Sequence, residues 1–112
     1  MKLEVTDVSS GTGVAAQRGD GLAIHYRGTL ENGKEFDSSY PRGETLDFTL
    51  GAGELIKGMD EGLVGLKVGG KRRLRIPPNM GYGAGGVPGV IPPNAVLIFE
   101  VELMAIRPPM SR

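Results

Sequence analysis

Hydrophobic and polar residues alternate with a period of two in several short segments of this 112-residue chain. The clearest case is 97–103, whose four odd-numbered residues are all apolar and would share one face of an extended segment. Such alternation is typical of strands that bury one face. It recurs at 22–27, 45–50 and 72–76, and we expect a further strand over residues 2–9.

One stretch follows a different period. Apolar residues recur every three to four positions, the spacing of one helix face, at Leu55, Ile56, Met59, Leu63 and Leu66. This spacing predicts one short helix over about 57–64, with Gly65 as a plausible stop. The predicted fold class is therefore α+β: an antiparallel β-sheet of five to six strands whose apolar face packs on one short α-helix.

Composition narrows the prediction. The chain holds 19 glycines and 8 prolines, many of them within 77–93, which excludes a mainly helical fold. Its length fits one domain, and we expect residues 1–112 to form it, with a short polar tail over about 107–112. We expect this domain to be a monomer.

Charge limits the classes of function. Thirteen Lys and Arg residues balance 13 Asp and Glu residues, without the basic surplus that nucleic-acid binding requires. The basic run at 71–75 is interpreted as a solvated strand face, with a partner-binding patch as the alternative. The pair Asp60-Glu61 is interpreted as solvated too, on the exposed side of the helix.

Cysteine content and hydropathy bear on the compartment. The chain has no cysteine, which excludes disulfides and thiolate metal sites. Residues 1–10 have no apolar run, and no apolar stretch approaches the roughly 20 residues of a membrane span. We therefore expect a cytoplasmic protein that does not enter membranes.

Two glycine-rich motifs suggest phosphate binding, but their surroundings argue against it. Gly81-x-Gly83-x-x-Gly86 matches a dinucleotide-binding fingerprint, which works only where a helix begins. The prolines that follow it prevent such a helix. In 69–72 the position that needs Ser or Thr in a phosphate-binding loop is an arginine.

The single histidine, His25, cannot form a multi-histidine metal site, and no metal or other cofactor is expected. A Ser–His–Asp arrangement of His25 with Asp37 and Ser38 or Ser39 is conceivable. We favour a surface histidine, because His25 falls on the polar face of its strand, opposite Tyr26.

Four aromatic residues and one acid occupy less ordinary positions. Tyr26 and Phe99 lie on apolar strand faces, and Phe36-Asp37 closes a short apolar segment. Taken singly, such aromatics more often belong to the core than to a site. Tyr82 is the exception, since a large aromatic within the Gly/Pro-rich loop has no visible packing role.

Ordered motifs along nearly the whole chain resemble the FKBP family, the tacrolimus- and rapamycin-binding peptidyl-prolyl isomerases. The matching segments are 25–28, 32–39, 50–51, 56–62, 68–72, 76–78, 82–83, 91–95 and 97–103. The resemblance implies a sheet half-wrapped around the short helix, with a pocket between them. It also implies an enzyme that isomerises X–Pro bonds in proline-containing peptides and unfolded proteins during protein folding.

The resemblance further implies roles for individual residues. The implied catalytic residues are Tyr26, Phe36, Asp37, Tyr82 and Phe99. The implied substrate-binding residues are Leu46, Leu55, Ile56, Met59, Val87, Val90 and Ile91. Tyr82 would donate a hydrogen bond from its hydroxyl, and Ile56 from its backbone N–H. Phe36 and Asp37 can both reach one pocket only if their strand bends locally, because neighbours in a strand face opposite sides.

The sequence departs from the family pattern at two pocket positions. The floor, usually Trp, is Met59, and a wall position, usually Phe, is Leu46. Methionine is flexible and has no rigid flat face, so we expect isomerase activity to persist and macrolide affinity to fall.

Two alternative functions stay open at this stage. One is a macrolide- or proline-peptide-binding module, or a chaperone-like scaffold of the same fold, with weak catalysis. The intact aromatic set argues for catalysis over it. The other is a small barrel that binds single-stranded nucleic acid, which is disfavoured because the basic run at 71–75 contains no aromatic residue.

Overall fold

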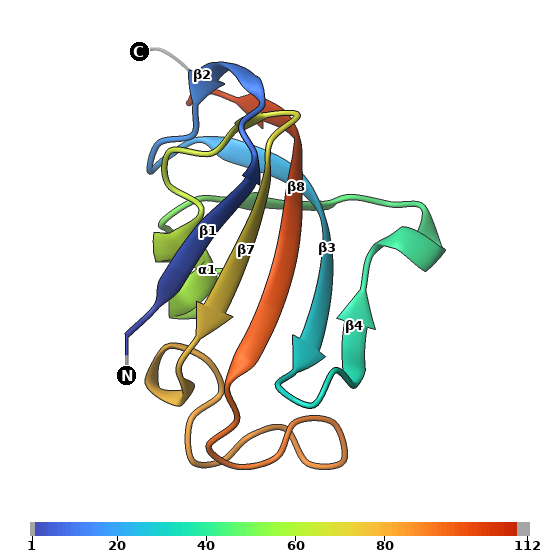
Figure 1. Ribbon diagram of the computed structural model, residues 1–112. Helices are drawn as coiled ribbons and strands as arrows, with labels where there is room; N and C mark the ends of the chain where they lie inside the picture. Colours follow the sequence, from blue (N-terminus) through green and yellow to red (C-terminus); the bar gives the residue numbers. More distant parts are fainter. Residues whose placement is uncertain (1, 110–112) are drawn as a thin grey trace.

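The computed structural model describes residues 2–109, and its regular structure there is mainly extended (Figure 1). A six-stranded antiparallel sheet has the order β1-β7-β8-β3-β4, and β5 pairs with β3. The strands of this sheet are β1 (Glu4–Ser9), β3 (Gly21–Leu30), β4 (Glu35–Ser38), β5 (Leu46–Thr49), β7 (Lys71–Ile76) and β8 (Leu97–Arg107). Strands β2 (Thr12–Ala15) and β6 (Lys67–Val68) form a second, two-stranded sheet. The predicted fold class is confirmed.

Strand β3 pairs with other strands along both of its edges. One edge pairs with β8 from Gly21 to Leu30. The other edge is shared, since β5 covers 21–24 and β4 covers 27–29. Tyr26 lies between the two covered stretches, where Ser39 supplies its hydrogen-bond partners.

The helix α1 (Lys57–Gly62) packs on one face of the sheet, behind β1 and β7 in Figure 1. Two glycines let it approach closely. A Cβ on Gly58 would lie 2.5 Å from Cγ2 of Ile76, and one on Gly62 would lie 2.8 Å from Cδ2 of Leu74. The helix backbone therefore lies close against β7, and the core near the end of the helix includes the fully buried Leu63.

The structure refines the predicted boundaries. Helix α1 ends at Gly62 rather than at 64, because Arg72 binds the carbonyls of Gly62 and Val64 (both Nη1···O 2.9 Å). Strands β2 and β6 were not predicted, and β4 was expected only through the family resemblance. The predicted tail over about 107–112 overlaps the end of β8, which continues to Arg107. Residues 110–112 of that tail lie outside the described part of the chain.

Two charged residues that were expected to be solvated are buried. Arg72 is 8% exposed, and besides the two carbonyls it contacts Asp7 (Nε···Oδ1 2.6 Å). Asp60 is 7% exposed and accepts hydrogen bonds from the N–H groups of Gly51 and Gly53 (3.0 and 2.8 Å). Both predictions were wrong because local polar partners make the burial of a charge tolerable.

Candidate active site

A cavity of about 410 Å³ opens between the sheet and helix α1. Strands β3, β4, β5 and β8 contribute one side of it, and helix α1, the loop before it and the loop between β7 and β8 contribute the other. The lining residues are Tyr26, Phe36, Asp37, Leu46, Gly53, Glu54, Leu55, Ile56, Met59, Tyr82 and Phe99. Every candidate from the sequence except Val87, Val90 and Ile91 lies in this wall.

Aromatic rings form the part of the wall that belongs to the sheet. Phe36 and Phe99 meet edge to face, with ring centroids 5.5 Å apart and planes at 85°. The rings of Tyr26 and Phe99 are tilted at 49° with centroids 6.1 Å apart. Gly28 makes room for them, since a Cβ there would lie 2.7 Å from the Phe36 ring and 2.9 Å from the Phe99 ring. The wall is therefore a packed surface with little freedom to shift.

A β-bulge brings Phe36 and Asp37 to the same cavity. Asp37 pairs with Gly28 and Glu35 pairs with Thr29, so Phe36 is an extra residue without a partner on β3. An extra residue changes the alternation of side chains and bends its strand. This bulge is the local bend that the resemblance requires for both side chains to reach one pocket.

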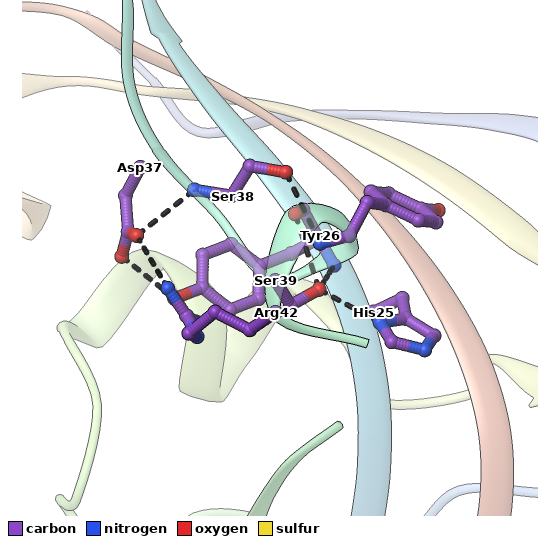
Figure 2. A network of polar contacts seen from close by, with 7 residues as sticks. His25, Tyr26, Asp37, Ser38, Ser39 and Arg42 are labelled. Atoms are coloured by element: carbon purple, nitrogen blue, oxygen red, sulfur yellow. Dashed lines mark hydrogen bonds and ion pairs between the residues drawn. The ribbon is translucent and has the colours of Figure 1, made fainter. Parts of the chain in front are cut away.

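Asp37 sits in a small polar network at the cavity rim (Figure 2). Its Oδ2 accepts a hydrogen bond from the Tyr26 hydroxyl at 2.6 Å, and its Oδ1 accepts one from the Ser38 N–H at 2.9 Å. Arg42 approaches both partners, with Nη1 3.4 Å from Asp37 Oδ1 and Nη2 3.3 Å from the Tyr26 hydroxyl. The network fixes the phenol and the carboxylate relative to each other.

The same network shifts two pKa values. Burial, and then the hydrogen bond to Asp37, raise the pKa of Tyr26 above its ordinary value, and Arg42 opposes part of this rise. The hydrogen bond to Tyr26 contributes most to raising the pKa of Arg42, and the hydrogen bond to Asp37 adds a smaller rise. Tyr26 is therefore a neutral hydrogen-bond donor to Asp37 at neutral pH.

Two donors at the opposite side of the cavity have no acceptor among residues 2–109. One is the backbone N–H of Ile56, the residue that precedes helix α1. The other is the hydroxyl of Tyr82, whose side chain is 42% exposed. Both lie in the wall of the cavity, where they can bind a carbonyl of a peptide.

Met59 of helix α1, the residue expected at the floor, lines the cavity and is 3% exposed. Leu46 of β5 stands at the wall position where the family pattern has an aromatic residue. Both aliphatic side chains border the aromatic group formed by Tyr26, Phe36 and Phe99. The lining is therefore part aromatic and part aliphatic.

Val87, Val90 and Ile91 belong to the loop between β7 and β8 and are not among the residues that line this cavity, so their expected contact with substrate stays a prediction. An isolated bridge between Val87 and Ile91 closes the loop on itself. The turn leaves Val90 48% exposed and buries Ile91 to 4%. Val90 and Ile91 line a separate groove with Leu30 and Lys34.

Several residues that shape the site were not predicted from the sequence. Gly53 and Glu54 line the cavity, and Asp60 holds the loop in which they lie. Arg42 reaches the Tyr26–Asp37 pair from the short 3₁₀ helix η1 (Tyr40–Arg42). No period in the sequence marks these positions, because their contacts are made by loops and backbone groups.

Two features are absent from residues 2–109. No group of three or more His, Cys, Asp or Glu side chains there is placed to hold a metal ion. In the same part of the chain, no helix has the length and apolar character needed to cross a membrane.

Comparisons with known proteins agree with the geometry. A family model described as FKBP-type peptidyl-prolyl cis-trans isomerase matches residues 13–104. A Neisseria meningitidis serogroup B protein named FK506-binding protein is 55% identical over 93% of this chain and 95% of its own length. A Schizosaccharomyces pombe protein named peptidyl-prolyl cis-trans isomerase is 50% identical over 96% of both chains.

Solved structures show the same fold. The crystal structure of AtFKBP13 matches with a TM-score of 0.86 and 44% identity, over 92% of this chain and 91% of that one. FkpA from Escherichia coli matches with a TM-score of 0.86 and 48% identity, over 95% of this chain but only 48% of FkpA. This chain therefore belongs to the FKBP-type peptidyl-prolyl cis-trans isomerases, enzymes that interconvert the cis and trans forms of X–Pro peptide bonds.

Proposed function

We propose that the cavity between the sheet and helix α1 is the site where the X–Pro bond is isomerised, with the prolyl ring over Met59 and between Tyr26 and Phe99. The observation that carries this proposal is the combination in one cavity of an aromatic wall and two donors without acceptors, the Ile56 N–H and the Tyr82 hydroxyl. A proline-containing peptide needs both an apolar surface for its ring and donors for its carbonyls.

The reaction itself explains why such a cavity can catalyse. The uncatalysed barrier is about 18–20 kcal/mol and arises from the amide resonance lost when the bond twists. No covalent bond is made or broken, so the enzyme needs no nucleophile. The planar amide is more polar than the twisted one, and water therefore stabilises the ground state more. An apolar cavity removes that preference and lowers the barrier.

The polar groups would orient the substrate. The Ile56 N–H and the Tyr82 hydroxyl would bind the carbonyls that flank the proline and hold the chain while the prolyl amide turns. Asp37 lies at the rim with one oxygen bound by Tyr26 and the other by the Ser38 N–H. Its carboxylate would interact with the carbonyl carbon of the twisting bond, whose resonance is lost in the transition state.

Exchange NMR on a proline tetrapeptide tests the site. Asp37→Ala should lower kcat/KM about tenfold or more, since hydrogen bonds to charged groups contribute about 1.5–3 kcal/mol. Asp47→Ala is a matched control, because Asp47 is an exposed aspartate of β5 outside the cavity. Equal activity of the Asp37 and Asp47 variants would exclude Asp37 from the site.

The binding of macrolides is a second part of the proposal. Relatives carry the name FK506-binding protein, and the cavity has Tyr26, Phe36, Tyr82 and Phe99 in its wall. We expect tacrolimus and rapamycin to bind more weakly than to an FKBP with an aromatic floor, by about 1–3 kcal/mol for the lost aromatic contact. Met59→Trp should restore this affinity, and a calorimetric titration without such a gain would refute the assigned floor.

The proposal also covers the natural substrates, the oligomeric state and the location of the enzyme. We expect the enzyme to act on proline-containing segments of unfolded proteins and to assist protein folding as a single-domain monomer in the cytoplasm. Acceleration of a proline-limited refolding reaction would support the first point. Size-exclusion chromatography and cell fractionation would test the oligomeric state and the location.

A further inference from the structure

A polar link connects the outer face of the sheet to the cavity through β3. Tyr26 points its ring into the cavity, and His25, the preceding residue, points to the opposite face. Both meet the buried hydroxyl of Ser39, which is 0% exposed. Figure 2 shows His25 and Tyr26 converging on Ser39, with Asp37 and Arg42 at the far end of the Tyr26 side chain.

Ser39 replaces the missing strand partner of Tyr26. Its Oγ accepts a hydrogen bond from the Tyr26 N–H at 2.8 Å, and its own N–H donates to the Tyr26 carbonyl at 3.0 Å. The Ser39 hydroxyl proton has two acceptors within reach, His25 Nδ1 at 2.9 Å and the Tyr26 carbonyl at 3.3 Å. The position of that proton therefore decides how firmly Ser39 holds the backbone of Tyr26.

The protonation state of His25 determines which of these two acceptors binds the Ser39 hydroxyl proton. A neutral ring with Nδ1 unprotonated takes the Ser39 proton, because Nδ1 is the nearer acceptor. A protonated ring carries N–H on both nitrogens and can only donate, so the Ser39 hydroxyl must turn to the Tyr26 carbonyl. Tyr26 then gains a third hydrogen bond to Ser39.

The turn that follows Ser39 also links the two faces. Tyr40 stacks on the His25 ring, with centroids 4.9 Å apart and planes at 18°. Two residues later Arg42 contacts the Tyr26 hydroxyl and Asp37 in the cavity rim. A change at His25 can thus reach the Tyr26–Asp37 pair both through the backbone of Tyr26 and through η1.

Several charged groups face His25 on the outer side of the sheet. Glu102 of β8 is its register partner, and Lys71 of β7 pairs with Glu102 in turn. Glu100 of β8 and Arg27 of β3 lie one pair further along the same face. The hydroxyl of Tyr40 donates to Glu102 at 3.2 Å.

We infer that His25 and Ser39 are positioning residues for Tyr26 and Asp37, and that protonation of His25 increases isomerase activity by tightening the hold on Tyr26. This inference rests on the proposed assignment of Tyr26 and Asp37 to the catalytic cavity. It gives a role to a histidine that the sequence assigned to the surface.

The test compares the wild type with His25→Asn, whose amide can reach Ser39 but does not titrate. A tetrapeptide substrate without titratable side chains avoids effects on the substrate. We expect kcat/KM of the wild type to be about twofold higher with the His25 ring protonated than with it neutral, the effect of one weak hydrogen bond, and the variant to show no such pH dependence. Arg73→Gln, an exposed charge change on the same face, should keep the wild-type profile.

A second readout follows the link without substrate. The Tyr26 amide resonance of the wild type should shift with the same midpoint as the His25 ring, and this shift should be absent in His25→Asn. Equal pH profiles of wild type and His25→Asn would overturn the inference, as would a Tyr26 amide that does not titrate with His25. Neither result would contradict the assignment of the cavity to catalysis, which the Asp37 and Asp47 variants test separately.

Discussion

One wall of the cavity belongs to the sheet, and the opposite wall belongs to loops and the helix N-terminus. On the sheet side, Tyr26 and Phe99 are each 6% exposed, and their rings contact each other. On the loop side, Tyr82 is 42% exposed, and its hydroxyl has no acceptor within residues 2–109. The sheet wall therefore serves the core and the cavity at once, whereas the loop wall serves mainly the cavity.

This difference predicts that substitutions in the two walls affect stability and activity differently. A substitution in the sheet wall removes packing from the core, so it should lower both stability and activity. A substitution of a donor in the loop wall should lower activity and leave stability nearly unchanged. Residues that hold the loop in place should fall between the two.

Phe99→Ala should give the largest effect. The side chain contacts Phe36 and Tyr26, and its removal should cost about 3 kcal/mol of unfolding free energy, the lower end for Phe→Ala because an open cavity already borders the ring. Urea denaturation measures this change, and kcat/KM should fall with it. Phe99→Leu, which keeps part of the volume, should lose less. A loss under about 1 kcal/mol for the alanine variant would show that the sheet wall is not part of the core.

Asp60→Asn should have an intermediate effect. The two carboxylate oxygens of Asp60 accept one N–H each from Gly51 and Gly53, and an amide can accept at only one of its two polar atoms. We expect a loss of about 1–3 kcal/mol in unfolding free energy and a lower kcat/KM, because the loop that lines the cavity is released.

The neighbouring Glu61 provides a matched control for Asp60. It is exposed, and its partner is Lys57 at 3.8 Å one helical turn away. Such exposed pairs contribute little, so Glu61→Gln should change the unfolding free energy by less than about 0.5 kcal/mol. Similar losses in both variants would mean that the charge of the helix, and not the hold on the loop, is what matters.

The two walls also differ in how far the sequence predicts them. Alternation places Tyr26 and Phe99 on apolar strand faces, because a strand that buries one face must repeat every two residues. It also predicts the burial of Leu74 and Leu103, which are 0% exposed. The sheet wall thus follows from a local rule that any strand obeys.

The loop wall follows from no local rule. The partners of Asp60 are backbone N–H groups seven and nine residues away, and no side-chain pattern records them. Alternation places Arg72 on the same face as the buried Leu74 and Ile76, but its charge led to the expectation of a solvated side chain, because no pattern records the backbone carbonyls of 62 and 64 that bind its guanidinium. The bulge at Phe36 was expected from the family resemblance alone, and the bridge between Val87 and Ile91 was not expected.

Tyr82→Phe should have the smallest effect on stability and so gives the sharpest test of the loop wall. The ring stays in place and only the hydroxyl is lost, so the unfolding free energy should change by less than about 0.5 kcal/mol. The activity should still fall about three- to tenfold, because the hydroxyl is proposed to bind a substrate carbonyl and one hydrogen bond contributes about 0.5–1.5 kcal/mol. Exchange NMR on the tetrapeptide measures the rate, and urea denaturation measures the stability.

Asn79→Ala gives the control for this variant, since Asn79 is an exposed residue of η2 (Pro78–Met80) just before Tyr82 and lies outside the cavity wall. It should leave both quantities unchanged. If Tyr82→Phe lost stability as Phe99→Ala does, the hydroxyl would be part of the fold, and the contrast between the two walls would fail. If it lost neither stability nor activity, the Ile56 N–H would be the only proposed donor left to bind substrate on the loop side.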